Sequence, residues 1–283
     1  VCINGELSRT IHEGQGIRQW GLTSTEIFKA RTNPLLKMVS ASPDSMRIGS
    51  IEVGAPTCAD DTCLLSKTPV GAQTAILLAQ HDSSRERYDF SETKTKVMLC
   101  GKKATSGITR DATPFSLNGK VLEYSTQETH LGIERTDTCM ATKTVEARVK
   151  TGRRIAYSLM GAGFHGLNGL SPEITVSMLN VYIVPAVLHG LETLRLKTSD
   201  YQILSTFHQS ILRCIQHLPK STASQALYLL TGSLPLEAAH HRNVLTLFCN
   251  MARREGSTER ELLLRQLAMK DMSSNSWTAL VRE

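Results

Sequence analysis

Hydrophobic and polar positions follow two different patterns along the chain. In the first half, short apolar runs are separated by polar turns, and only residues 23–38 and 68–89 have the apolar spacing of helices. From residue 141 onward, apolar residues recur at mostly helical spacing. The pattern therefore predicts an α+β fold, with a small antiparallel sheet and flanking helices first and an all-α part second.

Proline, glycine and polar clusters delimit the expected helices. In the second half we expect helices at residues 141–160, 173–196, 199–217, 223–231, 236–255 and 258–269. Pro185 should kink or break the second of these. Thr23 and Glu26 have the spacing of a capping box at the first helix of the chain. The polar tail from Asp271 is expected to fray.

Turn signals predict hairpins in the first half. The Asn-Gly pairs at residues 4–5 and 118–119 are the strongest short hairpin signal. Strands are expected at residues 115–122 and 129–133.

A third hairpin is predicted around two adjacent carboxylates, Asp60 and Asp61. The flanking runs, residues 53–59 and 62–65, suit strands, and aspartate tolerates turn geometry. Hard cations such as Mg²⁺ take oxygen ligands, so a rigid turn with two carboxylates can bind them. The alternative is an ordinary solvated turn.

Composition and length set outer limits. With 283 residues, 41% apolar and 20% charged, the chain has room for one large or two medium domains. No run of 18 apolar residues and no signal-peptide pattern occurs, so we expect no membrane association. The seven scattered cysteines favour reduced thiols in an intracellular protein. We expect the protein in the cytoplasm and nucleus and not secreted. Because the first residue is not Met, we expect a fragment of a longer protein.

The positive charge is concentrated in the second half. Residues 1–139 carry 16 basic and 16 acidic residues, whereas residues 140–283 carry 16 basic and 10 acidic residues. The expected helix 141–160 is basic and amphipathic, which suits a phosphate backbone, although a solvated face has the same pattern. Its cations are Lys143, Arg148, Lys150, Arg153 and Arg154.

Several segments resemble reverse transcriptases of non-LTR (LINE-type) retrotransposons, in the order found in that family. The matching residues are Gly16, Arg18, Gln19 and Ser24, then Ala59-Asp60-Asp61, then Lys94 and Lys96, then His130-Leu131-Gly132, then Pro185, Gly190 and Glu192. Trp20, Thr25 and Cys58 depart from the family pattern. His189 takes an aromatic position and is expected to pack in the core.

The resemblance implies a partial polymerase palm at residues 1–138, a basic helical thumb at residues 139–198 and a C-terminal helical region at residues 199–283. The implied activity is RNA-directed DNA synthesis with Mg²⁺ or Mn²⁺, an RNA template, a DNA primer and dNTPs. An endonuclease domain can precede such a module in the intact polyprotein.

The resemblance also implies a role for each matching residue. Asp60 and Asp61 would bind the metal ions, and Lys94 would serve the leaving pyrophosphate. Template and nucleotide would be contacted by Arg18, Gln19 and Ser24. The primer grip would consist of Thr129, His130, Leu131 and Gly132, and the nucleic-acid backbone would be followed by the five cations of the basic helix.

Two alternatives remain open at this point. The family has a further catalytic aspartate upstream of the segment at Gly16, with no counterpart in this sequence. The chain is therefore alternatively an inactive remnant that only binds template–primer nucleic acid. The second alternative is an unrelated α+β interaction protein.

Overall fold

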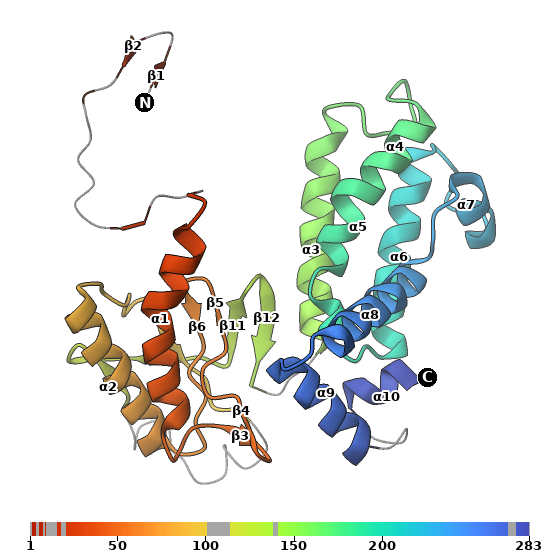
Figure 1. The fold of residues 1–283 in the computed structure, drawn as a ribbon. Coiled ribbons are helices and arrows are strands. Elements are labelled where there is room, and N and C mark those ends of the chain that lie inside the picture. The colour runs from red at the N-terminus through yellow and green to blue at the C-terminus, as the bar shows by residue number, and fades with distance from the viewer. Residues whose placement is uncertain are drawn as a thin grey trace. The chain divides into compact units, whose positions relative to one another are not determined.

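A computed structural model describes residues 2–3, 6–7, 9, 16–17, 21–100, 114–137, 141–270 and 276–282. The chain divides into two compact units (Figure 1). The first unit comprises Val1–Met46, Val53–Pro56 and Thr62–Phe90, and the second comprises Arg47–Glu52, Thr57–Asp61 and Ser91–Glu283. Short strands and many helices make the fold α+β, as predicted. The predicted domain boundaries stay predictions.

The first unit is built on two helices that pack against each other, α1 (Ser24–Ala41) and α2 (Pro69–Glu86) (Figure 1). The core between them consists of Leu35, Val39, Ala75 and Ala79. Helix α2 begins as expected for proline in the first turn, and the Thr68 hydroxyl accepts a hydrogen bond from the Gly71 amide at 3.0 Å. The predicted capping box at α1 is wrong, because the Thr23 side chain makes no capping bond.

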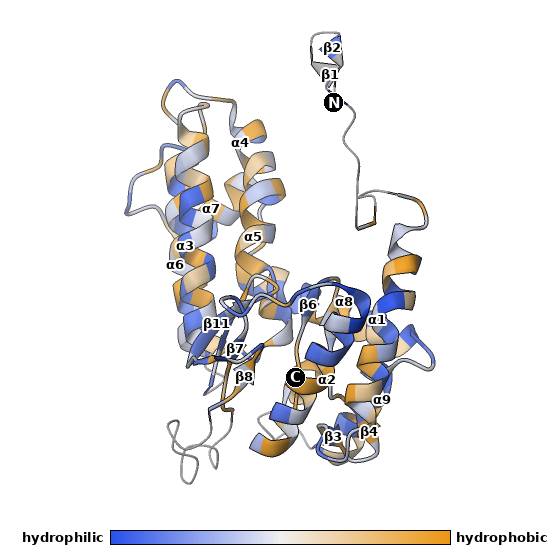
Figure 2. Ribbon diagram, turned by 90° about the vertical axis from the view of Figure 1, so that its left-hand side faces the viewer, coloured by the Kyte–Doolittle hydropathy of each residue, from blue (hydrophilic) through white to orange (hydrophobic). Residues whose placement is uncertain are grey.

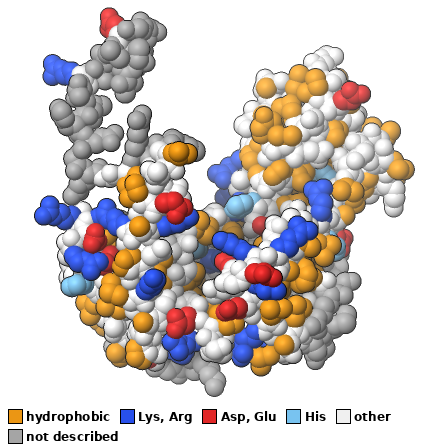
Figure 3. Space-filling model, in the orientation of Figure 1, with side chains coloured by type: hydrophobic (Ala, Val, Ile, Leu, Met, Phe, Trp, Pro, Cys, Tyr) orange, Lys and Arg blue, Asp and Glu red, His pale blue; other side chains and the backbone are white. Residues whose placement is uncertain are grey.

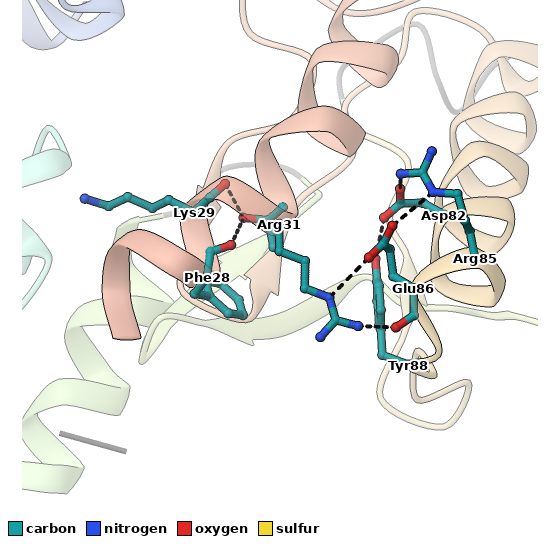
Figure 4. Close-up of polar contacts among 8 residues, drawn as sticks. Phe28, Lys29, Arg31, Asp82, Arg85, Glu86 and Tyr88 are labelled. Carbon is teal, nitrogen blue, oxygen red and sulfur yellow. Dashed lines mark hydrogen bonds and ion pairs between the residues drawn. The ribbon is translucent and has the colours of Figure 1, made fainter. Parts of the chain in front are cut away.

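A polar cluster joins the two helices (Figure 4). The Asp82 carboxylate is 1% exposed and accepts from Arg85 Nη2 at 2.9 Å and from the Tyr88 hydroxyl at 3.0 Å. Burial, and then the hydrogen bond to Asp82, raise the pKa of Tyr88 to about 12. From α1, the Arg31 guanidinium lies 5.3 Å from the centre of the Tyr88 ring and donates to the Glu86 carbonyl. The cluster thus fixes the end of α2 to α1.

Every sheet within the described ranges has two strands. The consecutive pairs are β1 (Cys2–Ile3) with β2 (Glu6–Leu7), β3 (Arg47–Ile48) with β4 (Ile51–Glu52), β5 (Thr57–Cys58) with β6 (Asp61–Thr62), β8 (Ser116–Leu117) with β9 (Lys120–Val121), and β11 (Gln127–His130) with β12 (Ile133–Thr136). The remaining pair, β7 (Lys96–Val97) with β10 (Glu123–Tyr124), is parallel. The expected single antiparallel sheet is therefore not found in these ranges, where the strands form separate two-stranded ladders.

Two of the hairpins have the same tight turn. Asn118 and Gly119 have φ angles of 51° and 78°, and Leu131 and Gly132 have 52° and 70°. Positive φ at both central residues is the requirement of a type I′ hairpin turn. The turn predicted at residues 118–119 is confirmed. A continuous strand over residues 129–133 is wrong, because residues 131–132 are the turn of a hairpin, the element that the resemblance implies for residues 128–133. The Asn-Gly pair at residues 4–5 lies outside the described residues.

The second unit is mainly helical. Its helices are α3 (Ala141–Met160), α4 (Pro172–Met178), the π-helix η1 (Leu179–Ile183), α5 (Val184–Leu188), the 3₁₀-helix η2 (Leu191–Thr193), α6 (Thr198–Ile215), α7 (Ser224–Thr231), α8 (Leu236–Arg253), α9 (Thr258–Met269) and α10 (Trp277–Arg282). The helix is not broken at Pro185: the backbone stays right-handed helical from the π-helical segment η1 into α5, which contains Pro185. The proline is accompanied by a change from α- to π-helical hydrogen bonding in the five residues before α5. The predicted fraying is wrong for α10, because Thr278 and Ala279 are buried and Trp277 Nε1 donates to the Glu192 carbonyl at 2.8 Å.

Helices α3, α5 and α6 lie side by side and enclose the larger hydrophobic core (Figure 1). Gly152 permits this close approach, because a Cβ atom there would collide with the Val187 and Phe207 side chains.

The segment Pro172–Thr193 is long and apolar enough to cross a membrane by length and composition alone. Core helices of globular proteins meet the same criterion, and Leu179 and Ile183 in this segment are fully buried.

Exposed apolar side chains gather over α4 and α7 (Figure 3). They include Ile174 at 50%, Leu229 at 84% and Leu230 at 66% exposure.

The core of the second unit also holds polar groups. His208 on α6 is 1% exposed, neither ring nitrogen has a partner among the residues described, and burial lowers its pKa to about 4.

The histidine pair of α8 is linked through a tyrosine. The Tyr201 hydroxyl lies 3.0 Å from His240 Nδ1 and 3.0 Å from His241 Nε2. Since His240 Nε2 lies 3.0 Å from the Leu191 carbonyl, it carries the proton and Nδ1 accepts from Tyr201. The pair therefore stabilises packing between α6 and α8.

Candidate nucleic-acid interface

The hairpin β11–β12 has the longest strands among the described residues of the second unit, four residues each. Its register pairs Gln127 with Thr136 and His130 with Ile133. On one face, the Glu134 carboxylate accepts from Gln127 Nε2 at 2.8 Å and from Thr129 Oγ1 at 3.2 Å. These cross-strand bonds add to the backbone ladder and hold the hairpin rigid.

Side chains of α3 bind this hairpin along its length. The Thr144 hydroxyl donates to the Glu134 carbonyl at 2.8 Å, and the Arg148 guanidinium donates to the Gly132 carbonyl. Lys143 Nζ donates to Gln127 Oε1 at 3.2 Å. The predicted primer grip and two cations of the predicted backbone-binding helix are thus brought together.

The segment after α5 holds the turn from another direction. His189 Nε2 lies 3.3 Å from the Leu131 carbonyl, so it donates to that oxygen. Gly190 has a φ of 79°, and a Cβ atom there would lie 2.5 Å from Ile133 Cγ1. Glycine is therefore required for backbone conformation and for close approach of β12.

Helix α3 has a buried face and an exposed cationic face. Figure 2 shows hydrophilic and hydrophobic residues alternating along the helix. With about 100° between successive residues, Lys143, Lys150 and Arg154 fall within about 40° of one another around the axis. All three are exposed, as is the neighbouring Arg153. Phosphates attract such a line of cations through counterion release, without any reading of sequence.

Arg148 differs from the other four cations of α3. It lies about 140° from Lys143 around the helix. Burial lowers its pKa, and the charges of Glu192 and Glu134 partly counteract that effect. Because its guanidinium is bound to the hairpin turn, its role in the structure is to position the hairpin, which the prediction of a direct backbone contact did not include.

The predicted acid pair lies at the tip of the hairpin β5–β6. Ala59, with a φ of 54°, and Asp60 form the turn, and Asp61 is the first residue of β6. Below the tip, backbone bonds join Cys63 to Pro56 at 3.0 Å and Leu65 to Gly54 at 2.7 Å. Both carboxylates are exposed. The predicted hairpin is confirmed, with one aspartate in the turn and one in the strand.

These carboxylates do not form a complete metal site by themselves. Across the parts of the chain that the structure describes, no group of three histidine, cysteine, aspartate or glutamate side chains is placed to hold a metal ion. Mg²⁺ favours octahedral oxygen ligands, and two exposed side-chain carboxylates leave most of that shell to water or to substrate phosphates. Among the described residues, Asp60 and Asp61 therefore supply two oxygen ligands of an incomplete set.

Lys94 lies in the turn before β7 and is exposed. Its backbone amide donates to the Ser91 carbonyl at 3.2 Å. The other lysine of that segment, Lys96, pairs with Glu123 on β10, which lowers the pKa of the Glu123 carboxyl. Of the two lysines, Lys94 is thus the one whose ammonium group faces solvent.

The predicted template-binding residues are only partly described. Arg18 and Gln19 lie outside the described residues, and Ser24 is the first residue of α1. His130 in the predicted primer grip is half-buried, and its Nε2 has no partner among the described side chains and backbone groups. Leu131 is 40% exposed at the turn.

Sequence reasoning missed the residues that position the hairpin. His189 was expected in the core, but it is exposed and bonded to the turn. Thr144 was not considered. A glycine directly after His189 was the available signal, because an isolated Gly at a helix end indicates positive φ and close approach of another segment.

Comparison with known proteins adds no family to this description. No protein-family model matches the chain, and no curated protein matches its sequence. Functional conclusions therefore depend on the residues and contacts above.

Proposed function

We propose that this chain binds template–primer nucleic acid through α3 and the hairpin β11–β12, as the palm and thumb part of a reverse-transcriptase-like module. One observation supports this most strongly. Arg148 and Thr144 bind the backbone of the hairpin, while Lys143, Lys150 and Arg154 form an exposed cationic line along α3 that begins beside Gln127 of the hairpin. A rigid turn beside a line of cations suits a polyanion of regular geometry.

Exposure and existing hydrogen bonds indicate which cations of α3 are free to contact phosphate. Lys150, Arg153 and Arg154 are exposed and Lys143 makes a single bond to an exposed glutamine, so these four can turn toward a backbone. Arg148 would lose its hydrogen bond to the Gly132 carbonyl at the hairpin turn if it turned toward a phosphate. We therefore assign backbone contacts to four cations and a positioning role to Arg148.

Binding can be tested by fluorescence anisotropy of a labelled RNA–DNA template–primer over a range of salt concentrations. Replacing Lys143, Lys150 and Arg154 by Gln together should reduce the slope of log K against log salt by about 2.7, because each lost phosphate contact reduces it by roughly 0.9. Replacing Lys220, Arg253 and Arg254 by Gln is the matched control. These three cations are also exposed, and their loss changes the net charge equally.

Equal losses in the two triple variants would refute a specific role of α3. No salt-dependent binding by the wild type, together with weak Mg²⁺ affinity, would favour the unrelated interaction protein instead.

A second candidate function is RNA-directed DNA polymerase activity, favoured by Asp60 and Asp61 at the tip of a hairpin whose base is held by backbone bonds. Mg²⁺, when bound, would neutralise charge on the dNTP phosphates. Asp60 and Asp61 would supply two ligands, and Lys94 would supply a cation to the leaving group. Because the described ligand set is incomplete, we propose that the chain alone holds template–primer without extending it.

Primer extension on an RNA template with Mg²⁺ and dNTPs separates these candidates. We expect no extension by wild type or by Asp60→Asn, with template–primer binding kept by both. Extension by wild type that disappears in Asp60→Asn would instead establish the chain as a polymerase with a complete metal site.

A further inference from the structure

Tyr157 is an exposed aromatic residue at the C-terminal end of the cationic face of α3. Its side chain is 63% exposed. Within the described ranges, the ring takes part in none of the aromatic contacts found. A large exposed ring on a charged helix face is available for a partner that offers another flat surface.

Two arginines lie directly beside this ring. Arg153 and Arg154 precede Tyr157 by four and three residues, which makes them its neighbours on the helix surface. Side chains on a helix lean toward its N-terminus, so the ring of Tyr157 extends over the turn that carries the arginines. The Arg154 guanidinium donates to Thr151 Oγ1 at 3.2 Å, which keeps it one turn further along and leaves the ring face uncovered by it.

This arrangement matches the two parts of a single nucleotide. Guanidinium groups bind phosphate, and an aromatic face stacks on a base. Arg154 and Tyr157 are separated by about 4.5 Å along the helix axis, and Lys150 and Arg154 by about 6 Å. A strand that follows the cations would thus bring one base to the tyrosine.

We propose that Tyr157 is a stacking platform for an unpaired base of a single-stranded segment whose phosphates contact Arg153 and Arg154. The proposal rests on the proposed function and narrows its ligand. Bases of a duplex are already paired and stacked on each other, so they offer no free face to the ring. A single strand, such as the template beyond the primer end, offers one with every nucleotide.

Tyr182 provides a matched control. It is 57% exposed, in the same unit, on η1. The segment Pro172–Thr193 around it contains no lysine or arginine, so it combines an exposed ring with no adjacent cation.

The test measures anisotropy of labelled oligothymidine and of a blunt duplex of the same length. Tyr157→Ala should weaken binding of the single strand by about tenfold and leave duplex binding within about twofold. Tyr157→Phe keeps the ring and should bind like wild type. Tyr182→Ala should change neither affinity. Circular dichroism of each variant checks that α3 is folded.

Unchanged single-strand affinity in Tyr157→Ala would overturn the stacking platform. Equal losses on single strand and duplex, or an equal loss in Tyr182→Ala, would overturn it as well. If the triple variant of the α3 cations still loses binding in these cases, the proposed function stands and only the stacking platform fails. If wild type binds neither probe, both fail.

Discussion

The hairpins β5–β6 and β11–β12 share a two-residue turn but differ in what holds them. The turn of β11–β12 is bound through both of its carbonyls, by Arg148 and His189, and its second strand packs on Gly190. In the turn of β5–β6, Asp60 is exposed to solvent, and backbone hydrogen bonds join the two arms of the hairpin below it. A hairpin that positions a nucleic-acid strand needs side-chain bonds at its turn, as β11–β12 has. Two exposed carboxylates, as at the turn of β5–β6, need further ligands before they can hold a metal ion in a fixed geometry.

The largest effect should follow from filling the space under β12. Gly190→Ala forces a residue with Cβ into positive φ and against Ile133, and should lower the free energy of unfolding by about 4 kcal/mol. Gly161→Ala is the control, since nothing lies within 4 Å of the added Cβ atom there. Chemical denaturation of both variants measures the difference. Equal stability of the two would mean that the hairpin does not depend on this contact.

Acid should loosen the helical unit that supports β11–β12. The pKa of His208 is about 4 in the folded protein and about 6.5 when unfolded, so below pH 6.5 the unfolded state binds more protons. Stability should therefore fall by about 3 kcal/mol as pH decreases from about 6.5 to about 4.

His208→Leu removes the proton that the unfolded state takes up at this position. The free energy of unfolding of the variant should therefore depend less on pH between about 4 and about 6.5. Denaturation at several pH values measures both proteins. A variant that keeps the full loss of stability would place the cause in other groups.

Variants of Arg148 and Lys150 separate two proposed roles on the same helix: positioning of the hairpin by Arg148 and contact with phosphate by Lys150. Arg148→Met removes a charged hydrogen bond to the turn and should cost about 2 kcal/mol of stability. Lys150→Met should change stability by less than about 0.5 kcal/mol, because the side chain is exposed. Thermal unfolding and template–primer affinity are measured together. The assignment of roles is wrong if Lys150→Met costs as much stability as Arg148→Met.

The smallest effect is expected at the tip of β5–β6. Asp60→Asn and Asp61→Asn should each change stability by less than about 0.5 kcal/mol, since both side chains are exposed. Mg²⁺ without nucleic acid should leave the melting temperature of wild type and variants unchanged. A rise with Mg²⁺ that Asp60→Asn abolishes would reveal a complete metal site and remove the contrast between the hairpins.

The helices were predictable because their signals are local. Apolar periodicity predicted α3 over its whole length, whereas Pro185 did not break the helix in which it lies. The hairpin tip at Asp60 was predictable from turn preferences of aspartate. Trp277 was not, because its contact with the Glu192 carbonyl joins residues far apart in sequence.

The candidate site was predictable only as a set of residue types. A basic amphipathic pattern identifies the cations of α3, but their burial depends on which face the hairpin covers. Arg148 has the same chemistry as Arg154 in the sequence, and only the Gly132 carbonyl beside it separates their roles. His189 similarly acquires its role from the carbonyl of Leu131.

Lysine footprinting tests the central claim most directly. The protein is acetylated with and without bound RNA–DNA template–primer, and modification at each lysine is measured by mass spectrometry. We expect Lys143 and Lys150 to be protected by the nucleic acid, whereas the exposed Lys220 should be modified equally in both states. Equal modification of Lys143 and Lys150 with and without template–primer would contradict the assignment of α3 as the nucleic-acid interface.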